Sequence, residues 1–334
     1  TFFALSYFTL YLQYQYPLGS TQKIIETFVK YIQANGGELL NRCEVISIDA
    51  DAKQVKTNDG TVYSYKQLLW AADTNRFYHC LDIGAIKQKR LQIELNSKKN
   101  FFASMKGADS IITVYMFTDL EPQTFKAKNG PHAFYTPKLD GISSVPVDSI
   151  MENGHFTRDK HVLFEYIKAN LSVNTLEISI PSLRDVTLSP QGKTALIVST
   201  LFDYALCEHL VACGYYDEFK KLASTEMVRI LDEGLWSGLS EHIEMTIVST
   251  PKTIYDRTYA TQGSVTGWSF ENHPFPVEYK FLSVSKSVHT PIKSIKQAGQ
   301  FTFNPAGVPV AVLTGKLAAD AVHKDLLKEN KHDK

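Results

Sequence analysis

The chain has 334 residues, of which 44% are hydrophobic and 21% charged, so it can bury a substantial core and long disordered stretches are not expected. Its 35 basic residues cancel its 35 acidic ones, which excludes a global field that would attract nucleic acid. No apolar run reaches the ~20 residues of a membrane-spanning helix. The scattered cysteines favour a reducing compartment. We therefore expect a cytoplasmic protein of about two domains, with peripheral membrane contact left open.

The N-terminal segment is the most apolar part of the chain and is rich in aromatic residues: Phe2, Phe3, Tyr7, Phe8, Tyr11, Tyr14 and Tyr16. We favour a helix that packs in the core, because aromatic side chains dominate cores by area. The alternative is that these rings line a tunnel for a long apolar substrate and contact a membrane surface. The chain opens with Thr1 inside this apolar segment, so we also expect the sequence to be a fragment.

From Leu18 to about Arg76 the pattern is typical of an α/β protein. Ser20 is a suitable N-cap for a helix whose apolar residues recur at helical spacing, and Asn35-Gly36-Gly37 ends that helix. The apolar run Leu68–Ala72 predicts a buried parallel strand. Between these elements, short β-type runs predict strands at Glu38–Leu40, Val45–Ile48, Gln54–Thr57 and Thr61–Tyr65, with a turn at Asn58-Asp59-Gly60.

Between about Arg76 and Ser287 the chain predicts a mixed or antiparallel sheet with helices on one side. Helices are expected around 81–95 and 215–235, the second because its apolar residues recur every three or four positions. Strands are expected at Ile111–Phe117, Ala133–Tyr135, Val162–Ile167, Leu176–Ile180 and Ala195–Leu201.

The tail returns to α/β character, with a strand at Ile295–Ala298, a glycine-bearing loop and a helix from about Val308 to Leu327. A helix N-terminus leaves backbone N–H groups free and carries roughly half a positive charge. It therefore suits an anionic ligand such as a reduced flavin, whose negative charge gathers on the N1–C2=O edge of the ring. Gly307 would let a flat ring approach the backbone, although an ordinary α/β turn has the same composition.

Other candidate sites are weaker. Cys207, His209 and Cys213 match no standard zinc spacing, so we predict no metal site and read this stretch as a helix with a partly buried cysteine. No GxSxG nucleophile elbow occurs, and the glycines show no GxGxxG fingerprint between a strand and a helix.

Several segments, taken in order, resemble the phytoene desaturase family, which includes carotenoid desaturases, carotenoid isomerases and retinol saturases and is related to flavin amine oxidases. The matching segments are Tyr16–Ser20 with Val45–Ile48, Ile180–Asp185 with Ser189–Lys193, Thr250–Thr253 with Arg257, Gly263 and Gly267-Trp268, and the tail Ala298–Gly315. That family begins with a strand–GxGxxG–helix unit, which this chain lacks, so the resemblance predicts a missing N-terminal portion. The loop Asn304-Pro305-Ala306-Gly307 also keeps only the last glycine of the family's glycine run.

The resemblance implies a partial FAD/NAD(P)-binding Rossmann-like domain plus a mixed β-sheet and helix substrate domain. The FAD-binding parts would be 18–76 and 288–334, the substrate domain 77–287, and 1–17 a connecting or substrate-domain helix. In this resemblance Val45 offers its backbone to the adenine, and Gly307 and Val308 lie under the isoalloxazine. All the implied FAD contacts are Val45, Ala71, Ala72, Gly299, Gln300, Gly307 and Val308.

The function implied is that of a FAD-dependent oxidoreductase, which transfers a hydride between a lipophilic polyene and flavin N5. No catalytic residue is named, because hydride transfer to flavin demands no fixed side-chain signature. One alternative is an amine-oxidase-like enzyme, which needs two aromatic rings flanking the substrate; Tyr255, Tyr259 and Trp268 are the candidates. The other alternative is a truncated, non-catalytic chain that cannot hold FAD alone.

Overall fold

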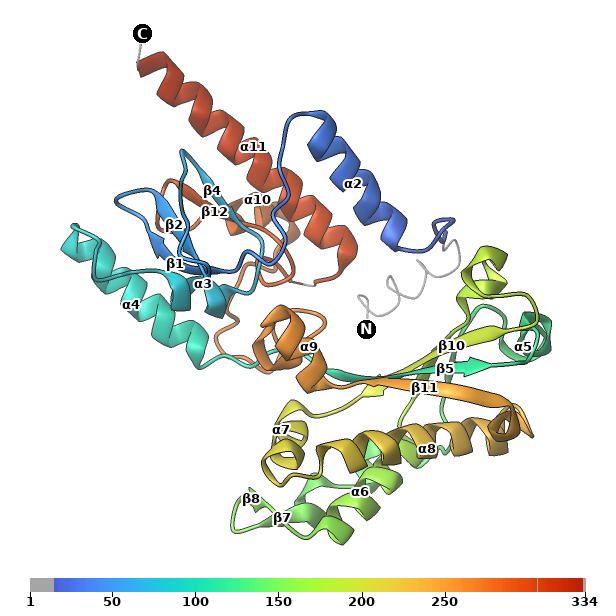
Figure 1. The fold of residues 1–334 in the computed structure, drawn as a ribbon. Helices are drawn as coiled ribbons and strands as arrows, with labels where there is room; N and C mark the ends of the chain where they lie inside the picture. The colour runs from blue at the N-terminus through green and yellow to red at the C-terminus, as the bar shows by residue number, and fades with distance from the viewer. Residues whose placement is uncertain (1–14, 305, 333–334) are drawn as a thin grey trace. The chain divides into compact units, whose positions relative to one another are not determined.

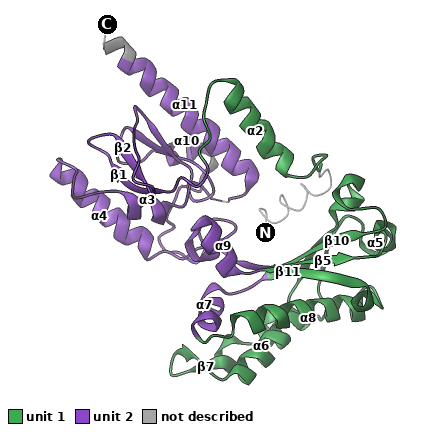
Figure 2. Cartoon of the chain, viewed as in Figure 1, with its two compact units in different colours: residues 1–40, 113–200, 213–248 green, residues 41–112, 201–212, 249–334 purple. Residues whose placement is uncertain are grey.

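The computed structural model describes residues 15–304 and 306–332, and the chain divides into two compact units (Figures 1 and 2). Of the described residues, unit 1 holds those up to Leu40, Thr113–Thr200 and Cys213–Val248. Unit 2 holds Asn41–Ile112, Leu201–Ala212 and the residues from Ser249 onward. These units are defined by packing, whereas the predicted domains are defined by function, so the predicted domain boundaries stay a prediction. The aromatic residues before Tyr16 lie outside the described residues.

Unit 1 is built on a five-stranded sheet with the order β11-β5-β10-β9-β6. Strand β9 pairs antiparallel with both β10 and β6. This confirms the predicted sheet and four of its predicted strands within a residue or two, and adds a strand that the sequence did not predict, β11. The strands are β5 (Ile111–Thr118), β6 (His132–Tyr135), β9 (Leu176–Ser179), β10 (Thr194–Leu201) and β11 (Ile243–Ser249).

One face of this sheet is covered by helix α8 (Tyr216–Gly234), which lies along the strands in Figure 1. The apolar residues predicted for this helix are buried except Leu222, which is half-buried. Ser224 Oγ donates to Thr246 Oγ1 of β11 at 2.9 Å. Helix α6 (Lys160–Val173) packs beside α8. Shorter elements of unit 1 are α5 (Pro122–Asn129), β7 (Met151–Glu152) and β8 (His155–Phe156). The sheet is therefore covered by helices on one side, as predicted.

Helix α6 corrects the prediction of a strand at Val162–Ile167. The short window is rich in β-branched and aromatic residues, which favours a strand. Over the longer segment, however, the buried residues include Leu163, Ile167 and Leu171, which recur every four positions on one helical face. Asp159 caps the helix by accepting hydrogen bonds from the N–H groups of His161 and Val162. The segment forms a helix because its apolar residues share one helical face and Asp159 caps its first turn.

Helix α2 (Gln22–Ala34) begins and ends close to its prediction, with Thr21 rather than Ser20 at the N-cap. Ser20 instead has a positive φ of 80°, and its Oγ accepts the Gln22 N–H at 3.2 Å. None of the side chains of α2 is buried. The strand predicted at Glu38–Leu40 is wrong, because this exposed segment has no partner strand and stays irregular.

Unit 2 contains the predicted β-meander and the predicted parallel strand. Strands β1 (Val45–Asp49), β2 (Gln54–Thr57) and β3 (Val62–Ser64) pair antiparallel in order. Strand β4 (Leu68–Trp70) pairs parallel with β12 (Ile295–Gln297), which joins segments far apart in sequence. The prediction that β4 is buried is wrong, since Leu69 is 37% exposed.

Six α-helices of the described residues belong to unit 2. They are α3 (Thr74–Cys80), α4 (Lys89–Ala103), α7 (Tyr204–Ala212), α9 (Pro251–Thr258), α10 (Val284–Ser287) and α11 (Val308–His332). The helix predicted around 81–95 begins only at Lys89, because Asp82 turns the chain by accepting the Ala85 N–H. No helix in the described part of the chain combines the length and apolar character that crossing a bilayer requires.

Helix α11 is fixed to β12 by an apolar contact and an ion pair. Ala318 is buried against Ala298 and Val288. Lys296, only 2% exposed, points its Nζ to Asp325 Oδ2 of α11 at 2.8 Å. The nearby ammonium holds the pKa of the Asp325 carboxyl below its usual range. Because the buried Lys296 ammonium has its carboxylate partner on α11, the position of this helix is part of the core energetics.

Candidate functional site

The first candidate site lies in unit 2, where β4 and β12 end side by side. The Ala298 N–H donates to the Trp70 carbonyl at 2.9 Å, so Ala71 and Gly299 follow the two strands at neighbouring positions. Gly299 has a φ of 99°, and a Cβ there would lie 3.4 Å from the Ala71 carbonyl oxygen. Crevices at the carboxyl ends of parallel strands are where ligands bind in open α/β sheets.

The loop after Gly299 is held in place by Gly267 and Trp268. The Trp268 side chain is fully buried, and its Nε1 donates to the Phe301 carbonyl at 3.0 Å. Gly267 has a φ of 81°, and a Cβ there would collide with the Gln300 carbonyl oxygen. Both residues belong to the segment that resembles the family, so the structure gives that motif a local role: it shapes the loop that leads to α11.

At the end of this loop, Gly307 and Val308 begin helix α11 at the surface. Gly307 has a φ of 127°, and the nearest atom to a Cβ there would be Pro309 Cδ at 3.9 Å. Val308 is 67% exposed. The first turn of any α-helix leaves its N–H groups without intrahelical partners, so the positive pole of α11 is open on this side. The bend is therefore not buried against its own sheet.

A polar atom beside this bend has no partner. Asn304 is 1% exposed, and its Nδ2 donates to the Trp268 carbonyl at 3.3 Å. Its Oδ1 is buried and accepts no hydrogen bond from residues 15–304 or 306–332. A buried acceptor without a donor costs ~1–3 kcal/mol, so a bound group with a donor would stabilise the site. Asn304 was not predicted as a site residue from the sequence; its signal there is a polar residue between Phe303 and Pro305.

Asp73 was also missed, and it anchors the turn after Ala72. This residue is 3% exposed and caps α3 by accepting the Arg76 N–H at 3.0 Å. Its Oδ2 accepts from both the N–H and the Oγ1 of Thr261 at 2.8 Å. Burial raises the pKa of the Asp73 carboxyl, although these hydrogen bonds oppose the shift. An Asp directly before a helix is a typical N-cap signal that the sequence offered.

Val45 lies apart from the strand-end residues, on the meander sheet of the same unit. It begins β1, and the pairing with β2 is irregular between Val45 and Ser47. Its carbonyl oxygen accepts a weak hydrogen bond from Cys80 Sγ at 3.3 Å. The structure thus brings Ala71 next to Gly299 and gives Val45 a local structural partner, and the role of Val45 toward adenine stays a prediction.

The second candidate site is the face of the unit 1 sheet opposite α8. Thr113 on β5 and Ser199 on β10 share a side-chain hydrogen bond at 2.8 Å, so these two side chains lie on the same face of the sheet. Thr246 points toward α8, so its neighbours on β11 point away from it. Because side chains alternate along a strand, one set of partly exposed residues shares the opposite face: Tyr115, Phe117, Ala195, Ile197, Met245 and Ile247. We call this set the open sheet face.

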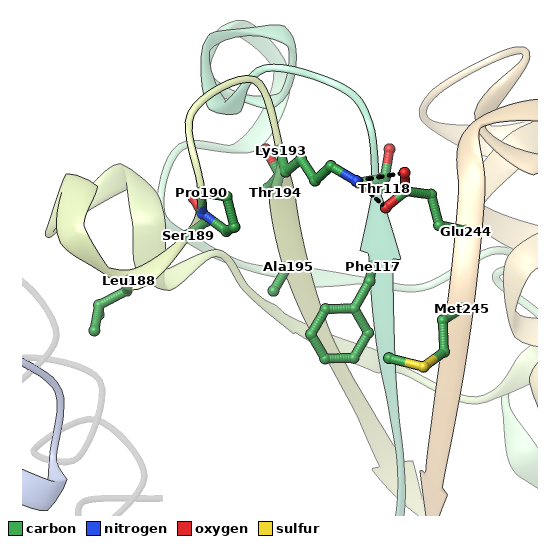
Figure 3. Close-up of a pocket in the computed structure, with 10 residues that line it drawn as sticks. All are labelled: Phe117, Thr118, Leu188, Ser189, Pro190, Lys193, Thr194, Ala195, Glu244 and Met245. Carbon is green, nitrogen blue, oxygen red and sulfur yellow. Dashed lines mark hydrogen bonds and ion pairs between the residues drawn. The ribbon is translucent and has the colours of Figure 1, made fainter.

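A pocket of about 200 Å³ lies at one end of the open sheet face (Figure 3). Phe117, Ala195 and Met245 form its apolar floor, and Leu188 and Pro190 form a wall beside it. An ion pair crosses its upper rim, with Lys193 Nζ 2.5 Å from Glu244 Oε1 and 2.7 Å from Oε2. An apolar surface with a few polar groups is the usual composition of a small-molecule site.

The aromatic residues considered for an amine-oxidase-like site do not flank a space. Tyr255 and Tyr259 contact each other edge to face, with ring centroids 6.1 Å apart and an interplanar angle of 82°. Trp268 is fully buried and stacks on Phe102 with centroids 5.6 Å apart. Two rings in direct contact leave no slot for a substrate between them, so this geometry disfavours the amine-oxidase alternative.

Cys207 lies buried on α7, and burial raises the pKa of its thiol. Within residues 15–304 and 306–332, no group of three or more His, Cys, Asp or Glu residues is placed to hold a metal ion. All four cysteines are free thiols.

Comparison with known proteins gives relatives over nearly the whole chain, although no family model matches it. Prolycopene isomerases 1 and 2 from an Oncidium hybrid cultivar are each 24% identical over 320 residues, covering 95% of this chain and 47% of theirs. The neurosporene-forming phytoene desaturase of Rhodobacter capsulatus is 23% identical over 315 residues, covering 92% of this chain and 53% of that protein. The chain thus spans about half the length of the curated relatives it matches.

Solved structures share the fold. A putrescine oxidase variant matches with a TM-score of 0.54 and 11% identity, covering 92% of this chain and 53% of its own. An oxidoreductase from Methanosarcina mazei matches with a TM-score of 0.52 and 12% identity, covering 92% and 55%. The chain therefore shares the mixed α/β fold of these two structures. Within that fold, the chain is a distant homologue of the prolycopene isomerases and the phytoene desaturase, which confirms the resemblance predicted from the sequence.

Proposed function

We propose that this chain is part of a FAD-dependent oxidoreductase that acts on a lipophilic polyene of carotenoid or retinoid type. Residues 18–76 and 288–334 then supply the second half and the C-terminal part of a Rossmann-like FAD-binding domain. The observation that carries the proposal is the loop from β12 to α11, which has open space at Gly307 and the buried, unpartnered Oδ1 of Asn304. The names of the relatives, prolycopene isomerase and phytoene desaturase, support a polyene substrate.

When bound, FAD supplies the redox chemistry, a hydride moving between N5 and a substrate carbon with a proton exchanged at the neighbouring carbon. The chain's own groups would hold and polarise the FAD. The first-turn N–H groups of α11 at Val308 and Val310 stabilise negative charge nearby. Asn304 Oδ1 is free to accept a hydrogen bond. Ala71, Ala72 and Gly299, without bulky side chains, leave the backbone after β4 and β12 accessible.

The open sheet face supports the choice of an apolar substrate. Met245 is 51% exposed and Ile247 is 50% exposed, and both lie within β11, the edge strand of the sheet. Such surfaces mark binding sites more often than ordinary solvent-facing sheet. A polyene has no polar group along its chain, so burying it there would be favourable by the hydrophobic effect.

The amine-oxidase alternative predicts that an amine reduces the bound flavin. The chain would be loaded with FAD and mixed without oxygen with either a carotene polyene or putrescine, and the visible absorption of the flavin followed. We expect bleaching with the polyene and none with the amine. Bleaching by putrescine alone would favour the alternative and contradict our proposal.

The truncated alternative predicts that the 334-residue chain cannot hold FAD. Titration of the purified chain with FAD, followed by quenching of flavin fluorescence, decides between the two. We expect micromolar binding from the β12–α11 loop and the strand ends. Absence of binding would mean that the residues of this chain do not suffice, and would favour the non-catalytic alternative.

A further inference from the structure

The pocket at the end of the open sheet face has a charged rim that the proposed hydride chemistry does not use. Lys193 precedes β10 and Glu244 lies on β11, on either side of β5 (Figure 3). Their side chains are 45% and 43% exposed, so both remain accessible to a ligand. The ammonium has three donors and the carboxylate several lone pairs, so each keeps spare hydrogen-bonding capacity within the pair.

Two of the hydroxyl groups that line this pocket are already engaged. Thr118 Oγ1 accepts from the Leu120 N–H at 3.1 Å, and Thr194 Oγ1 donates to the Leu120 carbonyl at 2.6 Å. The rest of the floor is apolar. The ion pair is therefore the charged feature that a ligand in this pocket meets.

The size of the pocket limits what it holds. About 200 Å³ is the volume of roughly seven water molecules and lies below the ~300–1,000 Å³ typical of pockets that enclose a drug-sized ligand. It thus fits one end of a longer molecule. Beyond the pocket, the apolar residues Tyr115, Ile197 and Ile247 continue the same face, so the remainder of an apolar chain has a surface to follow.

We propose that this pocket binds the hydroxyl-bearing end of a linear apolar ligand, with Lys193 and Glu244 as the specificity-determining pair. The hydroxyl oxygen accepts from Lys193 Nζ, and its proton is donated to Glu244. This inference rests on the proposed function for the polyene nature of the chain, and it narrows the substrate from a hydrocarbon to an alcohol.

The chemistry of the pair excludes the other end groups. A carboxylate attracted by Lys193 would be repelled by Glu244, and an ammonium attracted by Glu244 would be repelled by Lys193, so neither gains from the pair as a whole. A hydrocarbon end would remove water from the ion pair without replacing its hydrogen bonds, which costs free energy. An alcohol is both donor and acceptor, so it can hydrogen-bond to both partners at once.

Binding of three probes to the 334-residue chain tests the proposal: all-trans-retinol, retinoic acid, and the hydrocarbon that carries hydrogen in place of the retinol hydroxyl. Affinities come from quenching of tryptophan fluorescence, without added FAD. We expect retinol to bind about tenfold more tightly than either analogue, since tenfold corresponds to one hydrogen-bonded group recognised. Equal affinities for retinol and the hydrocarbon would overturn the proposal.

A double variant assigns the preference to the pair. Lys193→Met with Glu244→Leu keeps the apolar stems and is expected to reduce the preference for retinol to about twofold or less, because both hydrogen-bonding groups are gone. Lys168→Met with Glu165→Leu removes an exposed ion pair of α6 and is the matched control. An unchanged preference in the Lys193/Glu244 variant would contradict the assignment. Circular dichroism verifies that both variants are folded.

Filling the pocket gives an independent readout. Ala195→Phe places a ring on the pocket floor and should weaken binding of retinol and of the hydrocarbon alike. Unchanged affinities in this variant would show that the ligand binds elsewhere. Because these measurements need no flavin, failure to bind FAD would reject the proposed function alone, and loss of the alcohol preference would reject the pocket alone.

Discussion

The two candidate sites differ in the chemical groups that form them. The site in unit 2 is built from backbone: glycines with positive φ at 267, 299 and 307, strand ends, and a helix pole. The pocket in unit 1 is built from side chains, with an apolar floor and a charged rim. A backbone site recognises a ligand that many proteins share, such as a cofactor, whereas a side-chain site sets which substrate fits. We therefore expect substitutions at the backbone site to change stability or FAD binding, and substitutions at the pocket to change substrate preference.

The largest effect is expected at Gly267, where the backbone site depends on the absence of a side chain. Gly267→Ala adds left-handed strain and a collision with the Gln300 carbonyl oxygen, for a total of about 3–5 kcal/mol. Urea denaturation measures it. Gly60→Ala is the matched control, since Gly60 has a φ of 88° and nothing within 4 Å, and it should cost only about 1 kcal/mol. Similar costs at both positions would mean that Gly267 does not shape the loop.

The next effect concerns the ion pair that fixes α11 behind the backbone site. Asp325→Asn leaves the buried Lys296 ammonium without its carboxylate and should lower the free energy of unfolding by about 2 kcal/mol at neutral pH. This is less than the ~3–5 kcal/mol of a fully buried pair, because Asp325 is 32% exposed and partly screened. Asp320→Asn, which breaks the exposed pair with Lys316, is the control and should cost almost nothing.

The same variant has a pH signature. The pKa of Asp325 is lowered in the folded state, so its stabilisation is present above 3.8 and is lost as the pH falls through the folded-state value below it. Wild type should therefore lose stability toward acid in a step that Asp325→Asn lacks. Parallel curves for the two proteins between neutral pH and strong acid would contradict the ion pair.

A smaller effect on the pH dependence of stability, opposite in sign to that of Asp325, is expected at Asp73. Burial raises the pKa of this carboxyl, so the folded state binds more protons than the unfolded state just above pH 3.8. The free energy of unfolding should fall as the pH rises through that interval. Asp73→Asn should remove this slope while keeping the side-chain volume. The difference between the two stability curves measures it, and a flat difference would mean that Asp73 is not desolvated.

The sequence predicted the backbone site better than the pocket, and the reason is physical. Gly299 and Gly307 are visible in a sequence because only glycine adopts their φ values easily, and the strand–loop–helix order around them is local. The pocket depends on β5, β10 and β11 lying side by side, and β11 was not predicted. Residues such as Lys193 and Glu244, 51 positions apart, become neighbours only through that pairing.

Helices α8 and α2 show a second limit of sequence patterns. Both were predicted from the same apolar spacing, and both are helices. Phe219 of α8 is fully buried, whereas Phe28 of α2 is 50% exposed. Periodicity identifies an amphipathic helix, because spacing decides which residues share a face. It does not identify what that face packs against, which depends on tertiary contacts.

The central claim is that the bend at Gly307 presents the pole of α11 to the flavin, and FAD affinity of two glycine variants tests it most directly. Gly307→Val adds a branched side chain at a φ of 127°, whereas Gly315→Ala changes a position within α11 with nothing within 4 Å. We predict that Gly307→Val weakens FAD binding at least about tenfold relative to wild type and that Gly315→Ala leaves it unchanged. Equal FAD affinity in wild type and Gly307→Val would contradict the claim.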